Sequence, residues 1–211
     1  MLLGVEPAAH QLDGDALREL GADVLAFMDA QGRERATLVG HSMGSFMAQQ
    51  VALAAPEQVA GLVLVGSATE IRKFNGVPEL AGVVEQMTDP VPVAFIREFQ
   101  ASTVYRPVPD AFMQRVVAES QKLPAHAWKA LLAGFLATPR ADGLRARAPR
   151  TLIVWGEHDA FAPRAEQQTL QALIPGAVLK SYPDVAHTPQ WEQPAEFAGD
   201  LIGFLEGQPA S

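Results

Sequence analysis

The stretch TLVGHSMGSFMAQQ, residues 37–50, decides the fold of this chain. Its first half is apolar and typical of a short buried strand, and its second half has the amphipathic pattern of a helix. At the junction, Ser42 lies between Gly40 and Gly44. Small residues two positions before and after a serine permit the sharp strand-to-helix turn that presents a nucleophile above a sheet. The helix N-terminus would also favour negative charge developing there. The stretch therefore predicts a nucleophilic serine.

The bulk composition restricts the class of protein. The 211 residues are 48% hydrophobic and 19% charged, as in an ordinary globular domain. A formal net charge of −8 argues against a nucleic-acid or anionic-membrane partner, because either would require a basic patch. The chain has no cysteine, which excludes disulfides, thiolate metal sites and a cysteine nucleophile.

The N-terminal stretch MLLGVEPAAHQLDGD lacks the basic and apolar regions of a signal peptide. No apolar run reaches the ~18 residues expected of a membrane-spanning helix. We therefore expect a cytoplasmic protein, with a homo-oligomer as an open possibility.

Strand patterns alternate with helix patterns at both ends of the chain. The run VAGLVLV is apolar on both faces, which is typical of a strand in a parallel sheet covered by helices on both sides. Strands are predicted at residues 36–40, 59–65, 150–155 and 177–182, and helices at residues 13–30, 43–55, 164–173 and 193–205.

The middle of the chain follows a different pattern. Prolines recur, strand patterns are weak, and amphipathic helices are predicted at residues 93–99, 112–121 and 127–136. We expect an α/β core in two parts, residues 1–68 and 149–211, with residues 69–148 inserted as an all-helical cap at the edge of the sheet where ligands bind.

A serine hydroxyl needs a base, which is itself oriented by an acid. His187 follows the last predicted strand and precedes the final helix, at the right level to reach a serine at the strand ends, so we predict that it is the base. Asp159, in the loop after another buried strand, is the predicted acid. The alternative acids are Glu157, Asp184 and Glu70.

The sequence resembles the α/β-hydrolase superfamily, in the branch with a helical cap between the sixth and seventh strands. The resemblance rests on LVGHSMG, LVLVGSA, TLIVWGEHDAFAP and the His187 loop with its following helix. That branch includes enol-lactonases, small esterases, C–C bond hydrolases and cofactor-free haloperoxidases. The resemblance implies that Ser42, Asp159 and His187 form a catalytic triad and that neither a metal nor an organic cofactor is needed.

The resemblance also implies elements that this sequence lacks. In the family the turn that presents the nucleophile is called the nucleophile elbow, and the strand that leads into it, the elbow strand, is the fifth. A His-Gly motif after the third strand completes the oxyanion hole. Here only 36 residues precede TLVGH, and no His-Gly dipeptide occurs. We therefore expect a partial α/β-hydrolase fold, truncated at its N-terminus and without the first strands. The backbone N–H of Met43 would be the remaining oxyanion donor, and the elbow strand would be an exposed edge.

Aromatic residues in the cap and the site loops indicate an apolar substrate. Residue alternation along the strand predicts that His41 points to the opposite face of the sheet from Ser42 and cannot reach its hydroxyl. The candidate pocket residues are His41, Phe161, Trp191 and Trp128. The cap has no cluster of arginine or lysine that would favour a polyanionic substrate.

These observations predict a serine hydrolase that cleaves a small to medium apolar or aromatic carboxylic ester or lactone through an acyl-enzyme. The same triad would support C–C bond hydrolysis or perhydrolysis, and the triad residues alone do not separate these reactions. An inactive remnant that binds a ligand, or a partner chain through its strand edge, is a further alternative.

Overall fold

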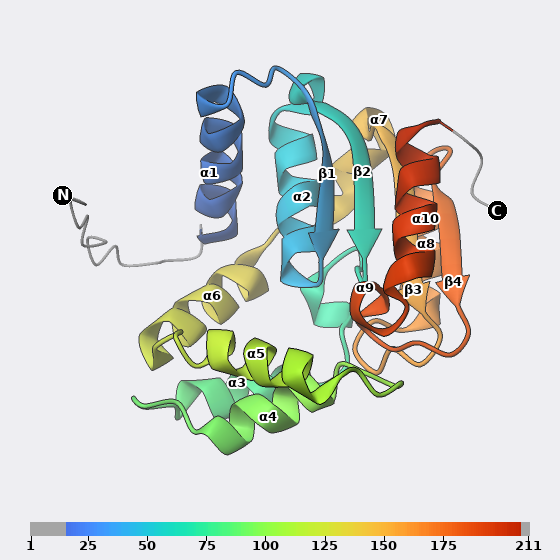
Figure 1. Ribbon diagram of the computed structural model, residues 1–211. Helices are drawn as coiled ribbons and strands as arrows, with labels where there is room; N and C mark the ends of the chain where they lie inside the picture. The colour runs from blue at the N-terminus through green and yellow to red at the C-terminus, as the bar shows by residue number, and fades with distance from the viewer. Residues whose placement is uncertain (1–15, 208–211) are drawn as a thin grey trace.

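The computed structural model describes residues 16–207, which form a parallel sheet flanked by helices. The sheet has four strands in the order β1-β2-β3-β4. Their bounds are β1 Ala36–His41, β2 Val59–Val65, β3 Arg150–Gly156 and β4 Val178–Tyr182. Each strand pairs in parallel with the next, so all four strands end at the same edge of the sheet (Figure 1).

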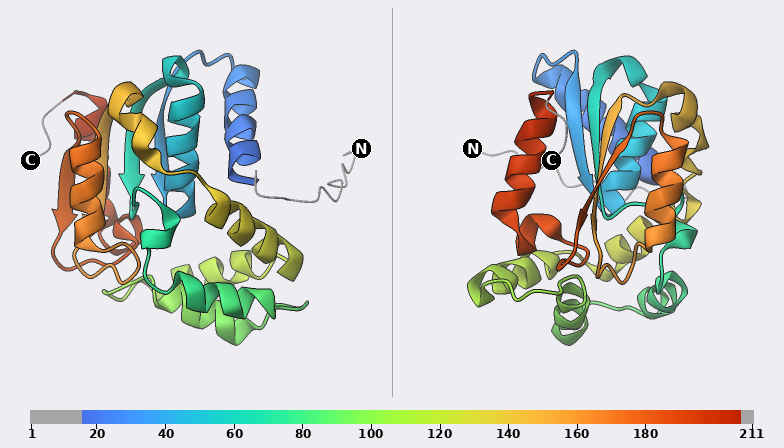
Figure 2. Two further views of the ribbon diagram at one scale, coloured as in Figure 1. Left: turned by 180° about the vertical axis from the view of Figure 1, so that it is seen from behind. Right: turned by 90° about the vertical axis from the view of Figure 1, so that its right-hand side faces the viewer.

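Helices cover both faces of this sheet. Leu62 and Leu64 of β2 point to one face, and Val63 and Val65 to the other, and all four side chains are buried. The first face packs against α1 (Ala16–Ala30), α2 (Met43–Ala54) and α8 (Arg164–Leu173), and the second against α10 (Pro194–Leu205). Figure 2 shows α10 on one side of the sheet and α2 and α8 on the other. The predicted parallel sheet with flanking helices is confirmed.

Between β2 and β3 all the regular secondary structure is helical. The main helices are α3 (Val77–Glu85), α4 (Val93–Ala101), α5 (Asp110–Ser120) and α6 (Ala125–Ala137). Short turns of helix flank them at Ile71–Lys73, Ala141–Gly143 and α7 (Leu144–Arg147). Helices α3 to α6 lie across the edge where the strands end (Figure 1). A cap in this place encloses the space above the strand ends.

Prolines lie in the first turns of several observed helices. α3 is not among the helices predicted above for this region, in which prolines recur. Proline is tolerated in the first turn of a helix, and Pro78 lies there. The helix predicted over residues 193–205 is present as α10, which begins at Pro194, and a short further helix, α9 (Pro189–Glu192), precedes it. Residues 13–15 of the first predicted helix lie outside the described residues, as does the N-terminal stretch.

β1 is an edge strand of the described sheet. It pairs with β2 on one side, and Val39 at its centre is 49% exposed. This is the exposed apolar edge that the sequence predicts for the elbow strand. Within residues 16–207, no helix combines the length and the apolar character needed to cross a bilayer.

Candidate active site

Ser42 lies in the turn between β1 and α2. Its φ of 51° is in the left-handed region that side chains other than glycine rarely adopt, and its N–H donates to the carbonyl of Val65 (2.9 Å). A Cβ on Gly40 would lie 2.3 Å from the carbonyl oxygen of Gly44. The turn therefore requires glycine at position 40. A Cβ on Gly44 itself would meet no atom within 4 Å, so position 44 does not require glycine.

A buried polar network supports the elbow from below. The hydroxyl of Ser45 lies 2.6 Å from the carbonyl oxygen of Ser42 and 2.7 Å from the hydroxyl of Ser67. Gln49 donates to the same Ser67 hydroxyl (2.8 Å). Ser45, Gln49 and Ser67 are all buried. Their hydrogen bonds satisfy groups that would otherwise be costly to bury, and they tie the start of α2 to the end of β2.

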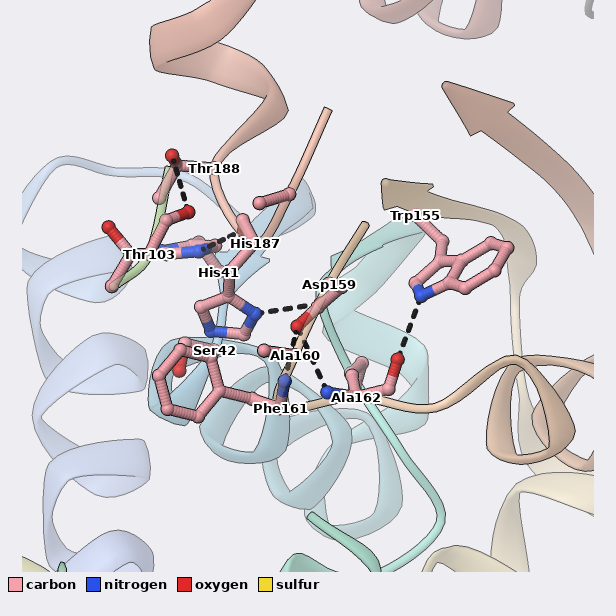
Figure 3. A network of polar contacts seen from close by, with 12 residues as sticks. His41, Ser42, Thr103, Trp155, Asp159, Ala160, Phe161, Ala162, His187 and Thr188 are labelled. Atoms are coloured by element: carbon pink, nitrogen blue, oxygen red, sulfur yellow. Dashed lines mark hydrogen bonds and ion pairs between the residues drawn. The ribbon is translucent and has the colours of Figure 1, made fainter. Parts of the chain in front are cut away.

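Asp159 and His187 form a buried pair beside Ser42. The Nδ1 atom of His187 lies 2.8 Å from Oδ2 of Asp159, while Oδ1 accepts the N–H groups of Phe161 (2.8 Å) and Ala162 (3.0 Å). An ionised carboxylate only accepts hydrogen bonds, so Nδ1 donates and Nε2 is left as a proton acceptor. Figure 3 shows Ser42 on the side of the His187 ring that faces away from Asp159.

Two glycines at strand ends make room for the loop that carries His187, residues 183–188 between β4 and α9, which we call the histidine loop. A Cβ on Gly66, directly after β2, would lie 2.8 Å from the His187 ring. A Cβ on Gly156, at the end of β3, would lie 2.0 Å from the carbonyl oxygen of Ala186. Gly66 belongs to the motif LVLVGSA and Gly156 to TLIVWGEHDAFAP, but in a sequence a glycine after a buried strand indicates only an ordinary turn. Their steric role was therefore missed.

His41 packs against the histidine loop. Its Nε2 lies 2.8 Å from the carbonyl oxygen of His187, and the two rings are 4.8 Å apart. His41 is the last residue of β1 and pairs in register with Val65, whose side chain lies on the face covered by α10. Burial, and then the neighbouring His187, lower the pKa of His41 to about 4. The ring is thus neutral near pH 7 and donates Nε2–H to the carbonyl.

The alternative carboxylates are engaged elsewhere. Each one is partly exposed and pairs with an arginine: Asp184 with Arg106 (2.7 Å), Glu157 with Arg164 (2.9 Å) and Glu70 with Arg140 (2.6 Å). Asp159 is therefore the carboxylate that contacts the predicted base. Among residues 16–207, no three histidine, cysteine or acidic side chains are grouped so that they could hold a metal ion.

A cavity of about 440 Å³ lies between the cap and the strand ends. Ser42, Met43 and His187 line it together with all four predicted pocket residues, His41, Phe161, Trp191 and Trp128. Its remaining walls are mostly aliphatic and aromatic side chains of the cap. Glu119 is the one carboxylate among the described lining residues, and no lysine or arginine is among them. A cavity with these walls suits an uncharged apolar group.

Comparisons with known proteins agree with the observed fold. A family model described as "alpha/beta hydrolase fold" matches residues 7–194. The chain is 29% identical to a dihydrolipoyllysine-residue acetyltransferase component of an acetoin cleaving system from Cupriavidus necator, covering 98% of this chain and 55% of that protein. It is 28% identical to a 2-hydroxy-6-oxo-6-phenylhexa-2,4-dienoate hydrolase from Burkholderia cepacia, covering 86% of this chain and 66% of that one.

Similarity to solved structures extends over most of the chain. An esterase from Exiguobacterium antarcticum superposes with a TM-score of 0.82 at 20% identity, covering 94% of this chain and 76% of that one. At this identity the match bears on the fold alone. The chain thus spans between about half and two thirds of the length of the first two relatives, and about three quarters of the esterase chain.

Proposed function

The chain belongs to the alpha/beta hydrolase fold family, and from that premise we propose that it is a serine hydrolase that cleaves small to medium apolar or aromatic carboxylic esters or lactones. The observation that carries the proposal is the contact between His187 and Asp159 (2.8 Å), with His187 lining the same cavity as Ser42. A nucleophile, a base and an acid that orients the base are the parts that acyl transfer requires.

In the proposed reaction, Nε2 of His187 takes the proton of Ser42 as the hydroxyl attacks the substrate carbonyl. Asp159 stabilises the imidazolium that forms, and the N–H groups of Phe161 and Ala162 hold the carboxylate in place. The backbone N–H of Met43, at the start of α2, faces the developing oxyanion. His187 returns the proton to the leaving group, and water activated by the same ring then releases the acid.

C–C bond hydrolysis is the second candidate, favoured by the similarity to the dienoate hydrolase of Burkholderia cepacia. The substrate named for that relative is a carboxylic acid. The described walls of this cavity hold no lysine or arginine to pair with a carboxylate. We therefore place esters and lactones first.

The test is labelling with a fluorophosphonate, read by intact mass. The unchanged protein should gain one adduct, and Ser42→Ala should gain none. Ser102→Ala is the matched control, because this serine is exposed and lies in the cap, and it should label like the unchanged protein. An adduct that persists in Ser42→Ala, or no adduct on folded protein, would contradict the proposal and favour a binding role.

A further inference from the structure

Glu192, the last residue of α9, makes contacts that none of the steps above uses. One carboxylate oxygen, Oε2, accepts the backbone N–H groups of Tyr105 (2.8 Å) and Arg106 (2.7 Å). The other oxygen, Oε1, accepts the N–H of Ala186 (2.9 Å) and lies 3.4 Å from the hydroxyl of Thr188. One carboxylate therefore joins the connection between α4 and α5 to the two residues that flank His187.

The same two segments meet a second time at His187 itself. The carbonyl of Thr103, in the α4–α5 connection, accepts the backbone N–H of His187 (3.0 Å) and the hydroxyl of Thr188 (3.2 Å). Thr103 and Thr188 are buried. Figure 3 shows them facing one another above the His187 ring. The main chain of the predicted base is thus held by the cap.

The α4–α5 connection also contacts the loop of the acid. The ring of Tyr105 stacks on His158, the neighbour of Asp159, with centroids 3.7 Å apart. Arg106 pairs with Asp184 before the histidine loop (2.7 Å). Tyr105 and Arg106 are also the residues whose backbone N–H groups donate to Glu192. If Glu192 released this segment, its contacts to both catalytic loops would loosen together.

We propose that Glu192 is a positioning residue that fixes the α4–α5 connection against the histidine loop. It thereby holds the His187 ring in place between Ser42 and Asp159. The proposal rests on the proposed function. Glu192 is not among the described residues that line the cavity, so it acts through His187. Hydrogen bonds to an ionised carboxylate are stronger than neutral ones, and a misplacement of about 1 Å can cost on the order of 10²-fold in rate.

The test compares Glu192→Ala and Glu192→Gln with the unchanged protein, using a p-nitrophenyl ester and hydrogen–deuterium exchange. In Glu192→Ala we expect faster exchange at residues 103–106 and 186–188. The value of kcat should fall by about 10- to 100-fold, with a smaller change in KM. Glu192→Gln keeps one acceptor oxygen but turns its amide group toward the N–H donors on one of the two sides, so its kcat should lie in between. Glu85→Ala, an exposed glutamate of the cap, is the matched control and should change neither readout.

Each outcome decides the proposal. Unchanged exchange in folded Glu192→Ala, or faster exchange with unchanged kcat, overturns it. If Glu192→Ala does not fold, Glu192→Gln is judged by the same two readouts. An unchanged protein that hydrolyses no ester would refute the proposed function instead, and the exchange rates would still show whether Glu192 holds the two segments together.

Discussion

At the scale of single residues, the two glycines of the elbow differ in what they contribute. Gly40→Ala places a methyl group 2.3 Å from a backbone oxygen, which forces the turn open, while Gly44→Ala meets open space. We expect Gly40→Ala to lower the free energy of unfolding by about 1–3 kcal/mol or more, as overpacking does. Gly44→Ala should be close to neutral or slightly stabilising, because alanine favours a helix. Urea unfolding measures both, and equal losses would contradict this account.

His41 gives the protein a specific dependence on pH. Its pKa is lowered from the ordinary value of 6.5 to about 4, chiefly by burial. As pH falls below 6.5, the unfolded chain binds a proton at His41 that the folded chain does not. The stability present above pH 6.5 is therefore lost between pH 6.5 and about 4, by up to about 3 kcal/mol.

The variant His41→Gln isolates this contribution, because an amide can donate to the His187 carbonyl without titrating. Urea unfolding of both proteins at pH 7.5 and pH 4.5 should show the larger loss in the unchanged protein. A loss of the same size in His41→Gln would mean that other groups carry the pH dependence.

At the scale of the secondary-structure elements, the two edges of the sheet differ. β1 exposes Val39 (49%) and has no charged side chain, whereas β4 exposes Val178 (41%) and carries Lys180 at its centre, paired with Asp200 (3.4 Å). Charged side chains on an edge oppose strand pairing between molecules. Val39→Lys should therefore reduce concentration-dependent self-association, measured by light scattering, with little loss of stability.

Val178→Lys is the matched control for this prediction. It adds a charge of the same sign to an edge that already carries one, so its effect on self-association should be small. A larger effect from Val178→Lys than from Val39→Lys would show that β4, rather than β1, is the edge through which molecules associate.

At the scale of the whole molecule, the sequence reveals features that depend on local pattern. Val59–Val65 is apolar on both faces, so a central strand could be predicted from it alone. Alternation along β1 does not reveal that the His41 ring contacts the carbonyl of His187, which is 146 positions away. Glu192 contacts Tyr105, 87 positions away, and no local pattern reports such a pair. The catalytic roles of Ser42, Asp159 and His187 stay predictions, although the structure brings these residues together.

The cavity as a whole predicts which substrates are accepted. Its described walls are mostly apolar and hold no lysine or arginine, so a substrate carboxylate buried there would lose its hydration without gaining a cationic side chain as a partner. We expect 4-nitrophenyl 4-methylbenzoate to be cleaved with a kcat/KM about tenfold or more above that of 4-nitrophenyl 4-carboxybenzoate. A factor of ten corresponds to about 1.4 kcal/mol of transition-state free energy. The two esters are similar in size, and their uncatalysed rates serve as the control. Equal values, or a preference for the acid, would instead favour an acidic substrate like the dienoate named for the relative.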